Sequence, residues 1–388
     1  MKQITLFSTI PLIACLAGCG VLADGFVGGM FKAGEKKGTF AGTFTAAVWN
    51  VQALFDGNET GGEYTEYLEA SGWTAEKYRA RVTAISRGIA QMIRPAGAAG
   101  TMPSGTVLPD LIGLVELENP TVLDDLALYE ISKRGYCWTA FAAIPGSSLG
   151  IGIISRYPVT DVRSHSITVG KDTAPRPVLE VRIAPNEKPL VFLLCHWKSK
   201  LGGDDATEAL RRASARVVSR RLYEIKAEEP ETPVIVMGDL NENHDEFRRR
   251  SGKVLTALLP DEGDAAEVAY NGVPAGRSAG AGNNFLVISG EKPPRADNFH
   301  DTVLALYSPW AGELTEGSYY YREEWETIDH FLLSDGLFDN TGWEYADART
   351  ANTAPFTGTD GTPSAYIPRY GGGLSDHLPL LLHLRYAQ

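Results

Sequence analysis

Six short apolar runs each end in polar side chains of the kinds that carry chemistry, and the runs are spread over most of the chain. In order they are Trp49-Asn50-Val51-Gln52, Leu114-Val115-Glu116-Leu117-Glu118-Asn119, Cys195-His196-Trp197-Lys198-Ser199-Lys200, Gly238-Asp239-Leu240-Asn241, Ile328-Asp329-His330 and Ser375-Asp376-His377. In a layered fold, side chains at strand ends can converge on one cleft. More than three hundred positions separate the first run from the last. They meet only if nearly the whole chain folds as one unit.

Strand-like apolar runs alternate with helical patterns beyond residue 42. The expected strands are Phe44–Val51, Leu111–Leu117, Gly150–Ser155, Leu190–Trp197, Val234–Gly238, Thr327–Leu333 and Leu378–Leu384. The expected helices are Glu76–Ile93, one that opens at Asn119-Pro120, and Asp205–Lys226. Residues 245–301 and 345–373 are expected to be long loops, either functional or disordered. This alternation indicates an α/β layered fold.

The N-terminus predicts export. Lys2 precedes an apolar run too short to span a membrane, and Leu16-Ala17-Gly18-Cys19 resembles a bacterial lipobox. The resemblance implies cleavage before Cys19 and acylation of its thiol, with a plain secretory peptide as the alternative. We therefore expect a lipoprotein signal peptide over residues 1–19, a glycine-rich flexible tether over 20–42 and a single catalytic domain over 43–388. Gly20 favours sorting to the outer membrane or cell surface.

The charge of the chain limits the kinds of partner it can bind. A formal net charge of -12 disfavours a protein that wraps nucleic acid through a broad basic surface. Local phosphate binding stays open, and carboxylates gathered around a divalent cation would account for part of the acidity. Cys137 and Cys195 lie in strand-like stretches and are expected to be buried free thiols.

Taken singly, most of the six runs are weak signals, but their order and number together resemble the exonuclease/endonuclease/phosphatase superfamily. The matching features run from about residue 44 to residue 384 and end in Ser-Asp-His before an apolar strand. His196-Trp197-Lys198-Ser199-Lys200 is also similar to the His-Phe-Lys-Ser-Lys of secreted bacterial nucleases. The resemblance implies a four-layer α/β/β/α sandwich, in which two mixed sheets are flanked by helices.

Phosphodiester cleavage needs an activated oxygen nucleophile and neutralised phosphoryl oxygens. His377 is the expected general base, because imidazole titrates near working pH, and Asp329 is expected to orient it. Glu116, Asn50 and Asp376 are the expected metal ligands. Their oxygens suit Mg²⁺ or Mn²⁺, and whether one or two ions bind stays open.

Further roles follow from the resemblance. Asn241 would donate to the scissile phosphate, and Asp239 would position water or bind a second metal ion. His196 would donate toward the phosphate or leaving group, and Arg176 and Lys198 would bind phosphate. For Arg176 the alternative is an ordinary surface charge at a strand edge, and for Lys198 it is a solvated side chain.

For three further sets of residues a structural role is expected or left open. His330 follows Asp329 along a strand and is expected to point to the opposite face, as a buried structural residue. Glu118 would either assist Glu116 or cap the helix that Asn119 begins. Arg212, Arg216 and Arg220 would form a solvated helix face.

Three readings of the function stay open. The first is an extracytoplasmic nuclease that cleaves DNA or RNA. Its weak point is that no aromatic-basic platform for single strands is recognisable from the sequence. The second is a phosphoesterase for phospholipid, sphingomyelin or a phosphorylated polyol, held near lipid by its anchor. The third is a non-catalytic surface-binding lipoprotein, which is ranked lowest because none of the expected site residues is missing. No protein partner is predicted.

Overall fold

The computed structural model describes residues 26–27, 42–93, 108–128, 131, 134–170, 172–173, 176–271, 282–299 and 303–387. The predicted signal peptide, Cys19 and most of the predicted tether lie outside these residues. Among the described residues, no helix combines the length and the apolar character needed to cross a membrane.

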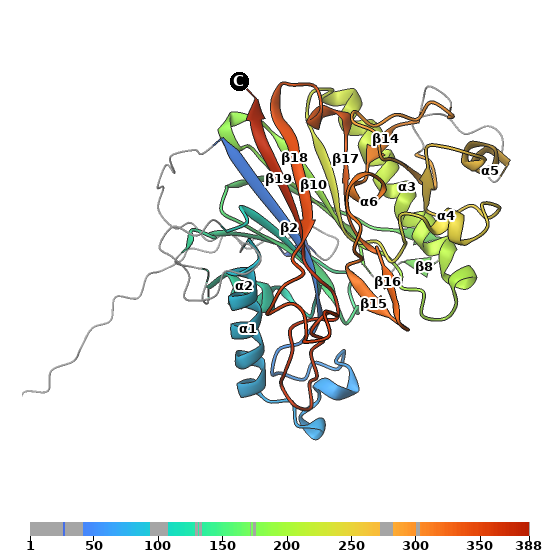
Figure 1. Cartoon of the computed structure of the whole chain (residues 1–388). Helices are drawn as coiled ribbons and strands as arrows, with labels where there is room; N and C mark the ends of the chain where they lie inside the picture. The colour runs from blue at the N-terminus through green and yellow to red at the C-terminus, as the bar shows by residue number, and fades with distance from the viewer. Residues whose placement is uncertain are drawn as a thin grey trace, which may run out of the picture.

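Two mixed sheets form the centre of the fold (Figure 1). One has seven strands, in the order β1 (Phe26–Val27), β4 (Trp138–Ala142), β5 (Gly150–Ser155), β3 (Leu111–Leu117), β2 (Thr43–Leu54), β19 (Leu380–Ala387) and β18 (Gly342–Thr350). The other has eight, in the order β12 (Leu258–Pro260), β13 (Leu286–Ser289), β14 (Ala305–Tyr307), β17 (Asp329–Leu333), β11 (Val234–Asp239), β10 (Leu190–His196), β9 (Val178–Ile183) and β6 (Val159–His165). Two hairpins stand apart, β7 (Thr168–Val169) with β8 (Asp172–Thr173), and β15 (Tyr319–Tyr321) with β16 (Glu324–Glu326).

Strand residues alternate between two buried faces, which explains why the central strands read as continuous apolar runs. On β2, Phe44, Ala46 and Val48 belong to the core between the sheets. Ala47 and Trp49 belong instead to the core beneath the helices on the other side. The residues of β10 divide in the same way between the inter-sheet core and the core under α3.

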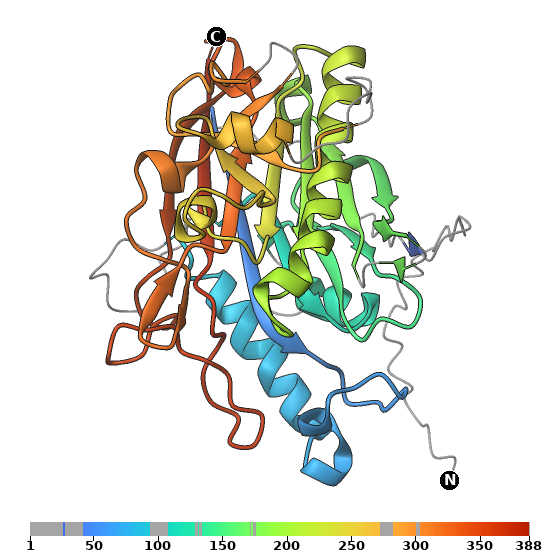
Figure 2. The ribbon, with the colours of Figure 1, turned by 90° about the vertical axis from the view of Figure 1, so that its right-hand side faces the viewer.

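Helices cover the two outer faces of the sheets. The seven-stranded sheet carries α1 (Ala75–Ile89) and α2 (Pro120–Leu128), and the eight-stranded sheet carries α3 (Asp204–Glu228), as Figure 2 shows from the side of α3. Shorter helices are α4 (Glu246–Arg249), α5 (Ala265–Asn271), α6 (Pro309–Gly312) and the 3-10 turns Thr65–Tyr67, Glu69–Ser71, Pro185–Glu187 and Asp335–Leu337. The predicted α/β sandwich with two mixed sheets and flanking helices is confirmed.

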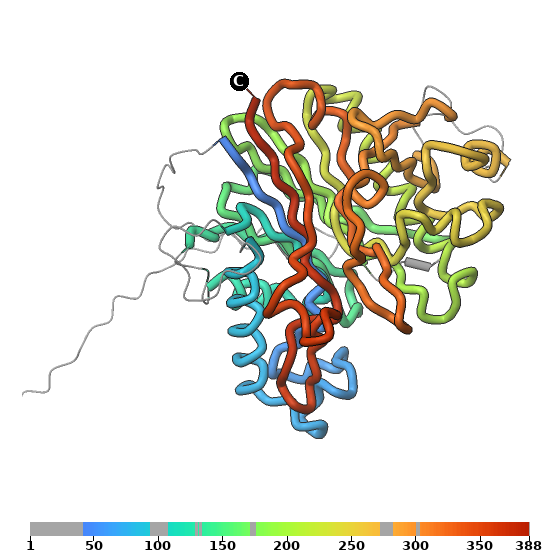
Figure 3. The backbone as a smooth tube through the Cα atoms, in the orientation of Figure 1, coloured from blue at the N-terminus to red at the C-terminus, as the bar shows by residue number. Residues whose placement is uncertain are grey.

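The two expected long loops are more structured than predicted. Residues 245–301 contain α4, β12, α5 and β13, and residues 345–373 begin inside β18. Beyond β18 the chain packs on the core, where Phe356 meets Trp49 edge-on with ring centroids 5.5 Å apart. In Figure 3 this red segment runs beside the blue segment that follows β2, and Trp73 and Tyr366 join the two with ring centroids 6.3 Å apart. The strands β12 and β13 were missed because three or four residues are too few to show a period of two.

The two described cysteines are free thiols. Cys195 is buried between α3 and its sheet, as expected, and burial raises the pKa of its thiol to about 12. Cys137 is only partly buried, so it departs from the expectation of full burial.

Candidate active site

Three expected site residues form one row across the eight-stranded sheet. His196 on β10 is paired with Asp239 on β11, and Asp239 is paired in turn with Asp329 on β17. Each lies two positions along its strand from an apolar residue of the inter-sheet core: Leu194, Met237 and Phe331. The alternation that builds the core therefore also points these three side chains toward the opposite sheet.

The seven-stranded sheet supplies Asn50 and Glu116 to the same place. Asn50 follows Val48 on the inter-sheet face of β2, and its Nδ2 donates to Glu116 Oε1 at 3.1 Å and to Asp239 Oδ2 at 3.0 Å. Glu116 sits at a register shift of β3 with φ of 69°, whereas strict alternation would turn it toward the helices with Leu114. A β-bulge of this kind re-aims a side chain, here into the centre between the sheets.

His377 and Asp329 form a buried hydrogen-bonded pair. His377 Nδ1 donates to Asp329 Oδ2 at 2.8 Å, and Ser318 Oγ donates to the same oxygen at 2.6 Å. The opposite ring atom, His377 Nε2, lies 3.5 Å from Asn50 Nδ2 and 4.0 Å from Asp376 Oδ1. The imidazole is thus fixed at one nitrogen, and the other faces the centre.

Asp376 is held in place by Gln52, which ends the first of the six runs and for which the sequence predicts no role. Gln52 Oε1 accepts from the backbone nitrogens of Tyr366 at 2.7 Å and Asp376 at 3.1 Å, and its Nε2 donates to Tyr366 O at 3.1 Å. One side chain on β2 therefore fixes the segment before His377. Its φ of 54° coincides with the register shift of β2 between Asn50 and Leu54.

The Gly-Asp-x-Asn sequence forms a tight turn at the end of β11. Gly238 has φ of 138°, and a Cβ there would lie 1.9 Å from Cys195 O on β10, so only glycine permits this approach. Asp239 Oδ1 accepts from Asn241 N at 2.9 Å, and Asn241 Nδ2 donates to Trp197 O at 3.2 Å. Asn241 itself has φ of 51°.

A buried ion pair behind this loop was not anticipated from the sequence. Arg211 on α3 donates from Nε to Glu242 Oε2 at 2.7 Å and from Nη2 to Glu208 Oε2 at 2.7 Å. Its Nη1 also donates to Lys198 O at 3.3 Å. Arg211 thereby ties the loop after β10 to the loop after β11. The arginines expected to form a solvated face of this helix begin at the next residue. Of these, Arg220 is exposed, whereas Arg212 and Arg216 are partly buried.

The remaining candidates lie at the margin of the centre. Arg176 Nη1 donates to Trp197 O at 3.4 Å, and the partly exposed Lys198 donates to Ser199 Oγ and Leu201 O.

His330 is fully buried on the opposite face of β17 from Asp329 and faces Glu242 O at 2.8 Å, as expected. Glu118 accepts from Asp56 N at 2.6 Å, and Asn119 rather than Glu118 caps α2, since its Oδ1 accepts from Val122 N.

Burial and crowded carboxylates shift the pKa values of the site. Burial lowers the pKa of His196 well below its ordinary value, and the nearby cations Arg176 and Lys198 lower it further. Burial would also lower the pKa of His377, but Asp329 and the other carboxylates hold it well above its ordinary value. Burial raises the pKa values of Asp239 and Asp376, and neighbouring carboxylates add to both effects. Acids that repel one another in this way favour a cation among them.

The donor set fits a hard divalent cation. Glu116 Oε1 and Asp239 Oδ2 face one point, and His196 Nε2 lies 3.8 Å and 3.7 Å from these two oxygens. Asp239, Asp329 and His377 each offer an atom within 4.8 Å of one another. Because Asp329 Oδ2 is already engaged by His377, Glu116 and Asp239 are the better placed ligands, with Asp376 beside them. Asn50 turns its nitrogen to the carboxylates, while its Oδ1 accepts from Gln52 N at 2.9 Å.

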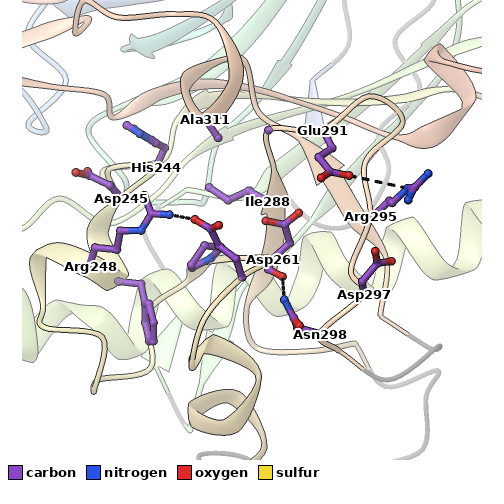
Figure 4. A pocket seen from close by; sticks show the side chains of 14 residues that line it. His244, Asp245, Arg248, Asp261, Ile288, Glu291, Arg295, Asp297, Asn298 and Ala311 are labelled. Carbon is purple, nitrogen blue, oxygen red and sulfur yellow. Dashed lines mark hydrogen bonds and ion pairs between the residues drawn. The ribbon is translucent and has the colours of Figure 1, made fainter.

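A cavity of about 340 Å³ lies elsewhere, between α4, α6 and the ends of β12 and β13. In Figure 4, Arg295 extends toward Glu291, and Asn298 points to Asp261, whose backbone oxygen accepts from its Nδ2. His244 lines this cavity and hydrogen-bonds Thr327 Oγ1 at 2.8 Å. None of the expected site residues lines the cavity, so it is separate from the carboxylate–imidazole centre.

An α/β sandwich with buried carboxylates and an oriented histidine between its sheets fits a metal-dependent phosphodiester hydrolase. The chain also matches the model described as Endonuclease/Exonuclease/phosphatase family over residues 45–283, which is more than half of its length. The chain belongs to this family. No curated protein matches it in sequence.

Several solved structures are similar to the chain at low identity. D. rerio TDP2, humanized by 14 mutations, has 14% identity and a TM-score of 0.47, covering 89% of this chain and 100% of its own. The human Nocturnin catalytic domain with bound sulfate has 14% identity and a TM-score of 0.47, covering 89% and 96%. An endonuclease/exonuclease/phosphatase from Bacteroides vulgatus has 14% identity and a TM-score of 0.46, covering 89% and 99%.

Proposed function

We propose that this chain is a nuclease that hydrolyses phosphodiester bonds of DNA or RNA with the help of Mg²⁺ or Mn²⁺. The observation that carries the proposal is the Asn50 amide, which lies within 3.5 Å of Glu116, Asp239 and His377 from both sheets. The His196-to-Lys200 run supports a nucleic-acid substrate, and it lies beside the site through His196. Arg176 and Lys198 add positive charge on that side.

Each residue has a chemical role in this proposal. A bound cation would offset the carboxylate charge that raises the pKa of His377. The neutral imidazole then accepts a proton from the attacking water at Nε2, and Asp329 stabilises the imidazolium that results. His196, kept neutral by burial, donates a hydrogen bond toward the phosphate or the leaving oxygen. Asn241 donates to a phosphoryl oxygen. A divalent ion held by Glu116, Asp376 and Asp239 would neutralise charge on the phosphoryl group; Asn50 would fix these carboxylates or turn its oxygen to the ion.

The test uses protein that lacks residues 1–19, incubated with plasmid DNA, RNA, sphingomyelin and inositol phosphates, each with and without EDTA. We expect EDTA-sensitive cleavage of DNA or RNA that exceeds turnover of the other substrates. A clear preference for lipid or inositol phosphate would refute the nuclease proposal while leaving the hydrolase class intact.

One observation favours the lipid alternative. Ile367 and Tyr370 are 50% and 75% exposed on one turn, closed by the bond from Tyr370 N to Ile367 O. Exposed apolar side chains on a turn can enter a lipid surface. Ile367→Ser/Tyr370→Ser would lower hydrolysis of vesicle-bound sphingomyelin in that case, and it would leave cleavage of DNA unchanged.

We further propose that the protein is exported and anchored by a lipid on Cys19. This proposal concerns the N-terminal leader and is independent of the catalytic site. The basis is the lipobox-like ending, Leu16-Ala17-Gly18-Cys19. Cells expressing the full chain would incorporate an alkyne fatty acid into it, and Cys19→Ser would abolish this labelling and release the protein from the membrane fraction. Labelling that survives the substitution would exclude Cys19 as the anchor.

A further inference from the structure

Three rings stand in a row from the catalytic histidine to the protein surface. Tyr319 stacks on His377 with centroids 4.5 Å apart and an interplanar angle of 28°. Tyr321 lies next to Tyr319 with centroids 6.1 Å apart and an interplanar angle of 16°. Tyr319 is partly buried, whereas Tyr321 is 46% exposed. The row therefore ends in a tyrosine ring that reaches the surface.

The β15–β16 hairpin holds these rings in place. Tyr319 and Tyr321 are two positions apart on one strand and share a face, while Tyr320 packs on Trp325 on the other face. The backbone of Tyr319 forms a bridge with that of His377, and Leu378 N donates to Ser318 O at 2.7 Å. The hairpin is thereby attached directly to the segment that carries the general base.

The turn of the hairpin carries a cation beside the outer ring. Arg322 and Glu323 form the two-residue turn with φ of 50° and 68°, which glycine would adopt at lower cost. Arg322 nevertheless occupies the turn, and its guanidinium lies over Tyr321, 5.1 Å from the ring centroid. Non-glycine residues held at positive φ cluster at active sites and ligand-binding segments.

We propose that Tyr319 and Tyr321 form an aromatic ledge that stacks the base of the nucleoside adjoining the scissile phosphate. The inference rests on the proposed nuclease function and makes it more specific. Every nucleobase has a π-face, so stacking on tyrosine binds nucleotides without selecting a sequence. A choline or polyol headgroup lacks such a face, and the ledge therefore favours nucleotide substrates over the lipid and polyol alternatives.

Charge indicates which part of the substrate meets the ledge. Glu323 and Glu324 are exposed on the hairpin and Glu326 is partly exposed, against the single cation Arg322. The hairpin is therefore net negative, and a chain of phosphates would be repelled there. The base itself is neutral. The cations Arg176 and Lys198 lie on the His196 side of the centre, which suits the continuing phosphate backbone.

The experiment compares two small phosphodiesters with the same leaving group: the p-nitrophenyl ester of thymidine 5′-phosphate and methyl p-nitrophenyl phosphate. We expect the wild-type protein to prefer the thymidine ester in kcat/KM. Tyr321→Ala should lower kcat/KM for the thymidine ester roughly tenfold, mainly through KM, because it removes one stacking contact. It should leave kcat/KM for the methyl ester within about twofold of the wild-type value. Tyr321→Trp should keep the preference for the thymidine ester.

Tyr270→Ala is the matched control, because Tyr270 is a 38% exposed tyrosine on α5 that contacts Phe299 with the rings tilted by 59° and lies outside the site. The ledge is refuted if the wild-type protein shows no preference for the thymidine ester. It is refuted equally if Tyr321→Ala affects both esters alike, or no more than Tyr270→Ala does. Failure of the nuclease function appears separately, as absence of cleavage of oligonucleotides by the wild-type protein.

Discussion

Arg211 donates to Glu242 at 2.7 Å with neither side chain exposed to solvent. Glu242 follows Asn241 directly, and its Oε1 accepts from Ala257 N at 2.9 Å. The pair therefore fixes the loop that carries Asn241 from behind, without touching the centre. A buried ion pair seldom exceeds the stability of an apolar equivalent, but removing one partner of such a pair is costly.

Arg211→Met is expected to lower the free energy of unfolding by about 3–5 kcal/mol, because it leaves Glu242 buried without its charged partner. Urea unfolding measures this change. Arg220→Met is the control on the same helix. Arg220 is 46% exposed and lies 3.6 Å from Glu224, so its loss should cost less than about 1 kcal/mol. Equal costs for the two variants would contradict the buried-pair argument.

Asp329→Asn is expected to lower kcat for bis(p-nitrophenyl) phosphate by roughly 10²–10⁴ with little change in KM, because His377 loses the carboxylate that orients its ring. His377→Ala should remove the activity altogether. Asp335→Asn, which changes an exposed acid paired with Lys226, should behave like the wild-type protein. Full activity in the Asp329 or His377 variant would remove that residue from the mechanism.

Binding of Mg²⁺ should stabilise the folded protein as well as restore activity after EDTA. A ligand at a hundredfold excess over its Kd adds about 2.7 kcal/mol, which a thermal melt detects as a rise in Tm. Glu116→Gln should lose most of this rise. Glu118→Gln should keep it, because Glu118 is engaged by Asp56 N. A rise in Tm that is the same in both variants would place the ion elsewhere.

Glu180 is expected to make the folded protein less stable as the pH falls into the acid range. Burial alone would raise its pKa, but His165 at 2.7 Å and Arg221 at 2.8 Å lower the pKa to about 2. A carboxyl whose pKa falls on folding stabilises the folded state above its unfolded pKa, near 4.5. This contribution is lost as the pH falls from about 4.5 toward 2.

Glu180→Gln should therefore cost on the order of 3 kcal/mol at pH 7 and progressively less as the pH falls through that window. Unfolding in urea at a series of pH values measures the difference between the variant and the wild-type protein. A difference that stays constant from pH 7 to pH 2 would show that the ion pairs of Glu180 do not cause it.

Glu323→Gly should stabilise the protein by roughly 1 kcal/mol, because it relieves a left-handed residue in the β15–β16 turn. Glu324→Gly, in the adjoining strand, should destabilise it instead. Thermal melts compare the two. A loss of stability in Glu323→Gly would mean that the turn is not strained.

The strands that carry the chemistry were predictable because they are buried on both faces. A run such as Leu190–His196 stays apolar until it leaves the core, so its first polar residue marks the strand end and the site. His330 was placed correctly on the far face by alternation alone. Edge strands were not predictable, since β6 has no fully buried residue and mixes polar with apolar residues.

The sequence by itself determined which polar residues end the central strands and, through their order, the family and its layered fold. Tertiary structure alone decided how those residues meet. Backbone geometry decides one of these features, the bulge that turns Glu116 inward. Partners far along the chain decide the others: the hydrogen bonds of Gln52 to Tyr366 and Asp376, the Arg211–Glu242 pair, and the row of rings from His377 to Tyr321. Local periodicity reports which face a side chain takes, but it carries no information about what lies opposite that face once the sheets pack.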